Sequence, residues 1–216
     1  MVITETMTQM QMEMIMSSNL EAEDVVTASM DQFIIKTQCP FIDEFEVLFQ
    51  NKGADSSKNT ATINGYQFDV TKRIKKDFNH VTEWIEGKCR ANKIPIKNLK
   101  IDMSWCIDYS EGGYQGLHSH GTDLISVVFH LDDQPEGEGF DGMFYSIMPR
   151  PVGTQWIQNH IPKRGQCLIL DGKVFHGVYP VKKPRRSVVI DFDYDWLEAD
   201  ETESADSDDN NKEKLQ

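Results

Sequence analysis

From residue 99 to residue 196 the chain alternates short runs of apolar, β-branched and aromatic residues with turns rich in glycine and proline. The runs are LKIDMSWCIDY (99–109), DLISVVFHL (123–131), GMFYSIM (142–148), TQWIQN (154–159), QCLIL (166–170) and SVVIDFDY (187–194). Segments of this length and composition predict strands, and the connecting EGGYQG, DDQPEGEGFDG and PKRG predict turns. Strands at this spacing predict a mostly β fold, either an antiparallel sandwich or a barrel.

Ahead of these strands the sequence predicts one further strand and two helices. Gln32–Thr37 is the strand candidate. Apolar residues recur at helical spacing between Pro40 and the Asn-Lys-Gly at 51–53, and again from Thr71 to Ala91, whereas the polar run 54–58 predicts a loop. The two stripes are Phe41, Phe45, Leu48 and Phe49, and then Ile74, Phe78, Val81, Trp84 and Ile85. Both helices are therefore expected to pack against the sheet.

The two ends of the chain differ in composition from this central part. Residues 1–23 hold six of the ten methionines without a clean period, which predicts a mobile arm. Residues 198–216 contain eight acids and two lysines, which predicts a disordered acidic tail. Residues 24–197 are expected to form one domain.

Charge and cysteine spacing limit the partners and the compartment. A net charge of −13 and a pI near 4.8 argue against nonspecific binding to phosphate backbones or to anionic membrane surfaces, and the sequence has no obvious basic groove for nucleic acid. The four cysteines are far apart without a CxxC pair, which favours reduced thiols. No run of eighteen apolar residues occurs, so a cytoplasmic protein is expected. The oligomeric state is not indicated.

Two histidine motifs suggest a metal site. His118 and His120 stand at i and i+2, so on an extended backbone both point to one face, and Asp123 follows within reach. His176 follows an Asp-Gly turn, nine residues before Arg185. A lone histidine after a turn is usually only a satisfied polar residue, and arginines at a strand start are usually solvated edge charges. The paired HxH motif favours metal binding instead.

The order of these motifs carries a family resemblance. A W-x-x-x-Y motif begins at Trp105, and a GGYxxxHxH motif with Gly113, Tyr114, His118 and His120 follows it. Ser126 then lies in an apolar strand. An H-x-V-x-P motif begins at His176, and an R-x-S motif leads into the last strand. This order resembles the iron(II)/2-oxoglutarate-dependent oxygenases over residues 99–196. It is similar to a group of HxH-type oxygenases of phage and marine bacteria. Its C-terminal motifs are similar to those of aspartyl/asparaginyl β-hydroxylases and prolyl hydroxylases. The resemblance implies a double-stranded β-helix, or jelly-roll, barrel.

The resemblance also implies a metal centre with one departure. In the family two histidines and a carboxylate hold iron(II), with H-x-D/E supplying the first two ligands. His118 and His176 match the histidines, but His120 stands where the carboxylate is expected. Three accounts stay open: His120 is a third histidine ligand, Asp123 supplies the carboxylate, or His120 replaces His118. The set of three histidine ligands is favoured. The alternative without a role for His120 is a solvated loop histidine beside a two-histidine metal site.

The implied co-substrate, 2-oxoglutarate, needs a cation and a hydroxyl for its far carboxylate. Arg185 and Ser187 alternate to one strand face and fit that role better than Arg186 does. His130 ends the strand after the metal loop, where the resemblance implies contact with the same carboxylate; its alternative is a solvated strand end. Trp105 and Tyr109 are expected to line or support the pocket.

The resemblance implies a dioxygenase that converts 2-oxoglutarate and dioxygen to succinate and CO2 while hydroxylating a C–H bond. One alternative is a cupin-like three-histidine metalloprotein without 2-oxoglutarate, which would have no need for Arg185. The other is an inactive barrel that acts as a binding module, with its pocket filled by side chains. The substrate is not indicated, although the loops Asp132–Asp141 and Pro149–His160 are expected to frame its entrance.

Overall fold

The computed structural model describes residues 24–29, 32–134, 139–149 and 155–197. The mobile arm expected at 1–23 and the acidic tail expected at 198–216 lie outside the described residues, as do parts of both loops expected to frame the entrance.

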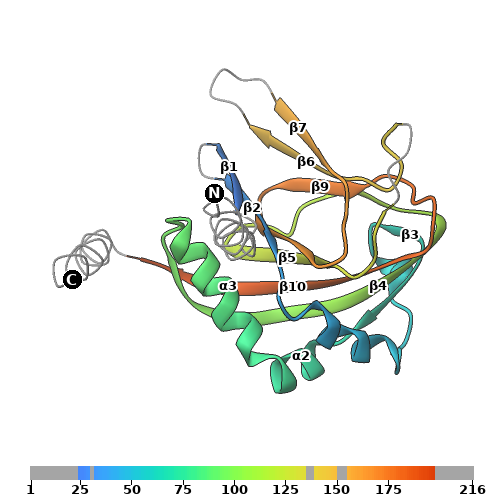
Figure 1. Cartoon of the computed structure of the whole chain (residues 1–216), viewed down its shortest axis with the longest axis horizontal. Coiled ribbons are helices and arrows are strands. Elements are labelled where there is room, and N and C mark those ends of the chain that lie inside the picture. The colour runs from blue at the N-terminus through green and yellow to red at the C-terminus, as the bar shows by residue number, and fades with distance from the viewer. Residues whose placement is uncertain (1–23, 30–31, 135–138, 150–154, 198–216) are drawn as a thin grey trace, which may run out of the picture.

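The described strands form one curled antiparallel sheet (Figure 1). They are β1 (Val25–Ser29), β2 (Gln32–Gln38), β3 (Thr62–Asp69), β4 (Ile96–His118), β5 (Leu124–His130), β6 (Phe144–Pro149), β7 (Gln155–His160), β8 (Gln166–Asp171), β9 (Phe175–Val178) and β10 (Arg185–Trp196). Their order is β1-β2-β8-β5-β10-β4-β9-β6-β7, with β3 paired to β4. The curl brings the two ends of this order together, since the Gln158 side chain on β7 donates to Thr27 Oγ1 on β1 at 3.0 Å.

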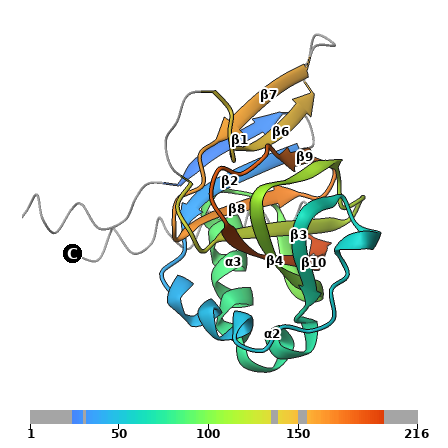
Figure 2. The same ribbon diagram turned by 90° about the vertical axis from the view of Figure 1, so that its right-hand side faces the viewer.

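Three of the described helices, η1 (Ile42–Phe49), α2 (Thr71–Asp77) and α3 (Asn79–Ala91), cover one face of the sheet. The short η2 (Ser57–Asn59) precedes β3. Figure 2 shows α2 and α3 on one side of the molecule, with β6 and β7 on the opposite side. Phe45 of η1 and Val81 of α3 pack against Phe129 and Val188 of the sheet in the main core. The expectation that the apolar stripes face the sheet is confirmed.

Alternation along the central strands divides the side chains between two environments. On β10, Val188, Ile190 and Phe192 belong to the core beneath the helices. Val189 belongs to a second cluster inside the curl of the sheet, with Ile107 of β4. Arg185 and Ser187 alternate to the same face as Val189, so these β10 side chains line a pocket inside the curl.

Two helix predictions need correction. The stripe after Pro40 forms a 3-10 helix, and the continuous helix expected over Thr71–Ala91 is two helices. Phe78 lies between them with φ −126°, outside the helical region. Because Ile74, Phe78 and Val81 are all buried, the break keeps the apolar stripe against the core while the chain changes direction.

The turn predicted at EGGYQG is also wrong. β4 continues through it to His118, with Gly112 at φ 76° where a side chain would be strained. β3 pairs along this extension, from Thr62 opposite Gln115 to Asp69 opposite Trp105. β1, β3 and β9 have no counterpart among the predicted strands, and β3 and β9 pair with β4 at the site.

The four cysteines are buried and unpaired, as expected. Within the described residues, no helix is both long enough and apolar enough to cross a membrane.

Candidate metal and carboxylate site

Three neighbouring strands build the floor of a pocket. The antiparallel register places Arg185 opposite Tyr109, and Ser187 between Ile107 of β4 and His130 of β5. Side chains directly opposite in such a register share a face. The wall across the pocket comes from β9 and β6. The full lining is Trp105, Ile107, Tyr109, Gln115, His118, His120, Val128, His130, Phe144, His176, Val178, Arg185, Ser187 and Val189.

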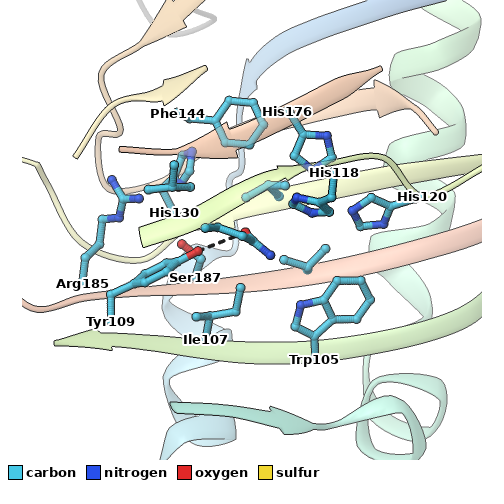
Figure 3. A pocket seen from close by; sticks show the side chains of 14 residues that line it. Trp105, Ile107, Tyr109, His118, His120, His130, Phe144, His176, Arg185 and Ser187 are labelled. Carbon is cyan, nitrogen blue, oxygen red and sulfur yellow. Dashed lines mark hydrogen bonds between the residues drawn. The ribbon is translucent and has the colours of Figure 1, made fainter. Parts of the chain in front are cut away.

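Three imidazoles meet at one end of this pocket (Figure 3). One ring nitrogen each from His118, His120 and His176 lies within 4.8 Å of the others. The ring centroids are 4.4 Å apart for His118 and His176, and 5.0 Å apart for His120 and His176. His118 and His176 are direct partners in the β4–β9 register, which fixes their approach. The structure thus brings together the histidines of both sequence motifs.

Hydrogen bonds outside the cluster fix how the three rings are turned. His118 Nδ1 is 2.8 Å from the Gly116 carbonyl, and His176 Nδ1 is 2.9 Å from the Val174 carbonyl. His120 Nδ1 faces a carboxylate. A carbonyl can only accept, so Nδ1 carries the proton in the first two rings and Nε2 keeps its lone pair. Buried neutral rings of this kind suit a metal, because only an unprotonated nitrogen can bind one.

Burial keeps two of these rings neutral. Desolvation lowers the pKa of His176 well below its usual value, and the neighbouring His118 and His120 lower it further. Desolvation also lowers the pKa of His118. Among the described residues, His120 Nε2 is buried without a hydrogen-bond partner. A buried ring nitrogen without a partner beside two neutral imidazoles fits a divalent metal.

The turn between β8 and β9 anchors the loop that carries His120. The His120 amide donates to the Gly172 carbonyl at 2.9 Å, and the Gly172 amide donates to the Leu124 carbonyl at 2.8 Å. A Cβ at position 172 would lie 2.7 Å from the Gly121 carbonyl oxygen, so this close approach requires glycine.

The carboxylate near the cluster is not the one considered from the sequence. Asp123 is exposed, has φ 65°, and is outside the group of potential ligands. Asp191 on β10 instead contacts His120 Nδ1, at 2.7 Å and 2.9 Å from its two oxygens. Its position could have been predicted, because Arg185, Ser187 and Asp191 are spaced by even numbers of residues and therefore share one face of the strand.

Arg185 lies at the other end of the pocket, over the Tyr109 ring (Figure 3). Its exposed fraction is 1%. Its Nη1 donates to the Gly142 carbonyl at 2.6 Å, whereas Nε and Nη2 have no hydrogen-bond partner among the described residues. Burial lowers its pKa to about 10. A buried guanidinium with free donors and no carboxylate bound to it is costly unless an anion completes it.

Two more predicted residues accompany Arg185. His130 is fully buried, with neither ring nitrogen paired among the described residues, so the solvated alternative is excluded. Burial and the adjacent Arg185 charge hold its pKa well below the usual value. Ser187 is buried between His130 and Ile107 in the sheet register. Tyr109 and Trp105 line the same pocket, and the Tyr109 hydroxyl donates to Gln115 Oε1 at 3.1 Å.

Arg186 points away from this pocket. Its guanidinium makes ion pairs with Asp132 and with Glu46 of η1, and it lies over the Phe49 ring. Its role in the described structure is to tie β10 to η1.

The pocket is narrow, and an open groove adjoins it. The cavity volume is only about 10 Å³, roughly the room that one water needs. A groove of about 290 Å³ lies beside His118 and His120. It is lined by Thr60, Ala61, Gln67, Met103, Trp105, Gln115, His118, Ser119 and His120. The groove reaches the histidines from the side of β3.

Comparison with solved structures identifies the fold. HygX of Streptomyces hygroscopicus, solved with nickel and 2-oxoglutarate, matches with a TM-score of 0.55 and 9% identity over 74% of this chain and 82% of its own. A 2OG-Fe(II) oxygenase family protein of Burkholderia pseudomallei matches with a TM-score of 0.53 and 13% identity, over 73% and 84%. A prolyl-4-hydroxylase of Pseudomonas putida matches with a TM-score of 0.50 and 12% identity, over 70% and 82%.

No family model matches the chain, and no curated protein is similar to it. At such low identities the structural likeness establishes the fold alone. The predicted fold, mostly β with flanking helices and curled into a jelly-roll barrel, is thereby confirmed.

Proposed function

We propose that this chain is an iron(II)- and 2-oxoglutarate-dependent dioxygenase. In the reaction, 2-oxoglutarate, dioxygen and a substrate C–H group give succinate, CO2 and the hydroxylated substrate. One observation carries the proposal: a single pocket holds three inward-facing imidazoles at one end and a buried, incompletely paired guanidinium, Arg185, at the other. Those two groups are what a chelating keto acid with a far carboxylate requires.

Each side chain then has a defined part. His118, His120 and His176 would hold the metal, which supplies dioxygen activation when bound. Arg185 would bind the far carboxylate of 2-oxoglutarate through Nε and Nη2, which have no hydrogen-bond partner among the described residues. Ser187 and His130 stand beside that position as further polar partners. The substrate would approach along the groove next to His118 and His120, which leaves the Arg185 end to the co-substrate.

Anaerobic reconstitution with iron(II) and 2-oxoglutarate tests the proposal. The complex should show the weak visible metal-to-ligand charge-transfer band of a chelated keto acid. Arg185→Gln removes the charged fork and should weaken 2-oxoglutarate binding at least tenfold, since losing one partner of a desolvated charge pair costs roughly 2–5 kcal/mol. Iron binding should barely change, because Arg185 lies at the far end of the pocket.

Arg186→Gln is the matched control. It removes the same charge from the adjacent residue, whose side chain is bound to Glu46 and Asp132 outside the pocket. Equal, near wild-type affinity for 2-oxoglutarate in both variants would contradict the assignment of Arg185.

The narrow cavity favours a second candidate, an inactive barrel that serves as a binding module. In that case 2-oxoglutarate would not produce the band at any concentration and iron affinity would be poor. A cupin-like metalloprotein would bind iron stoichiometrically without responding to 2-oxoglutarate. The same reconstitution therefore separates all three candidates.

A further inference from the structure

Asp191 is placed where it can control one of the three imidazoles. It lies on β10 opposite Ser126 of β5, on the strand face that also carries Arg185 and Ser187. Both Asp191 oxygens are within hydrogen-bond distance of His120 Nδ1, at 2.7 Å and 2.9 Å. The exposed fractions of the two side chains are only 6% for His120 and 8% for Asp191. A charge-assisted contact this well shielded is stronger than a surface ion pair.

His120 is also held on its ring face. The Trp105 indole stacks on the imidazole, with centroids 5.6 Å apart and an interplanar angle of 15°. The backbone bond from His120 to Gly172 fixes the start of the side chain. With Nδ1 committed to Asp191, the ring nitrogen left over is Nε2, which is buried and without a partner among the described residues.

The carbonyl partners of His118 and His176 are uncharged, so within the described part of the chain Asp191 supplies the carboxylate that contacts a ring of the cluster. Three neutral imidazoles alone would give the site no negative charge. An ionised Asp191 would bring the total to −1, the charge that two histidines and one carboxylate would have. A carboxylate behind a ligating histidine fixes its tautomer and raises its basicity.

We propose that Asp191 is a positioning residue, which holds His120 as the Nδ1–H tautomer with Nε2 directed at the metal and so compensates for the absence of a carboxylate at position 120. The inference rests on the metal site of the proposed function. It requires neither 2-oxoglutarate nor turnover.

Cobalt(II) binding measures the metal side of the proposal. Asp191→Asn keeps the side-chain size and should lower cobalt affinity at least tenfold, within the range of 10- to 100-fold that is usual for such partners. Asp193→Asn is the matched control, because it makes the same charge change two residues along β10 on an exposed side chain. It should bind cobalt as the wild type does.

A double-variant cycle tests whether Asp191 acts through His120. In a His120→Asp background there is no imidazole to hold, so adding Asp191→Asn should lower cobalt affinity threefold or less. A loss equal to that in the wild-type background would show a general charge effect and overturn the positioning role.

The tautomer itself can be measured without metal. In the protein labelled with 15N-histidine, at pH 8, the signal that His120→Asn removes should report a protonated Nδ1 and an unprotonated Nε2. A protonated Nε2 in the wild type would overturn the proposal, even if Asp191→Asn failed to fold. If cobalt binding and the tautomer behave as expected but 2-oxoglutarate never binds, the proposed function fails and this inference stands.

Discussion

His176 is the ligand candidate whose loss should matter most. Its exposed fraction is 3%, it pairs with His118 across β4 and β9, and its ring contacts both other histidines. His176→Ala should therefore abolish stoichiometric iron(II) binding, measured by metal analysis after anaerobic gel filtration. His80→Ala, on the half-exposed surface of α3, is the control and should bind iron normally. Full iron content in His176→Ala would mean that the cluster does not hold the metal.

At the residue scale the sequence predicted the inward face of β10 only in part. Period-2 alternation placed Arg185 and Ser187 together, and it extends to Asp191 without further assumptions. The contact between Asp191 and His120 could not be predicted, because it depends on the register of β10 against β5 and on the loop after His118. Asp123 looked suitable because it is near in sequence, yet its backbone turns it outward.

The β8–β9 turn is an element whose geometry should control the metal end of the pocket. Gly172→Ala places a Cβ 2.7 Å from the Gly121 carbonyl and 2.8 Å from the Leu124 carbonyl, so the loop carrying His120 must shift. We expect a loss of about 1–3 kcal/mol in unfolding free energy, together with weaker metal binding. Urea unfolding and a cobalt titration measure the two effects.

Gly87→Ala on α3 is the control for that change. Nothing lies within 4 Å of a Cβ at this helical position. The variant should gain about 0.5–1 kcal/mol from helix propensity and keep wild-type cobalt affinity. If both glycine variants bind cobalt equally well, the turn does not set the position of His120.

Elements with a clean period were predictable, and those stabilised by tertiary pairing were not. The strands at 123–131, 166–170 and 187–194 form because their apolar runs are buried on both faces. β3, which was not predicted, contains Asn64 at positive φ followed by Gly65, a pair typical of turns. It becomes a strand because β4 offers a partner beyond EGGYQG. The single-helix prediction failed at Phe78, where packing overrides local propensity.

Buried neutral histidines should make the stability of the whole molecule depend on pH. Burial lowers the pKa of His160 to about 4 and that of His130 well below 6.5. The unfolded chain takes up these protons below about pH 6.5 while the folded one does not, so stability is full above that pH and falls as pH decreases toward 4. We expect a loss of about 1–2 kcal/mol per histidine between pH 6.5 and pH 5.

Urea unfolding of the metal-free protein at pH 7, 6 and 5 measures this loss. His160→Gln cannot take up the proton and should lose less stability across the series than the wild type. His80→Gln changes a half-exposed side chain on α3, and as the control its curve should follow that of the wild type. Parallel curves for all three proteins would show that His160 is not a source of the pH dependence.

The pairing of His118 with His176 has a consequence for the thermal stability of the protein. These residues lie on strands far apart in the sequence, and β9 is only four residues long. A metal bound to both would act as a clip across the mouth of the barrel, and a ligand that binds only the folded chain stabilises it by mass action. At a free metal concentration of 100 times Kd the gain is about 2.7 kcal/mol, or roughly 5–10 °C in Tm for a chain of this size. A low metal concentration would thus lower the stability of the folded chain as well as the occupancy of the site.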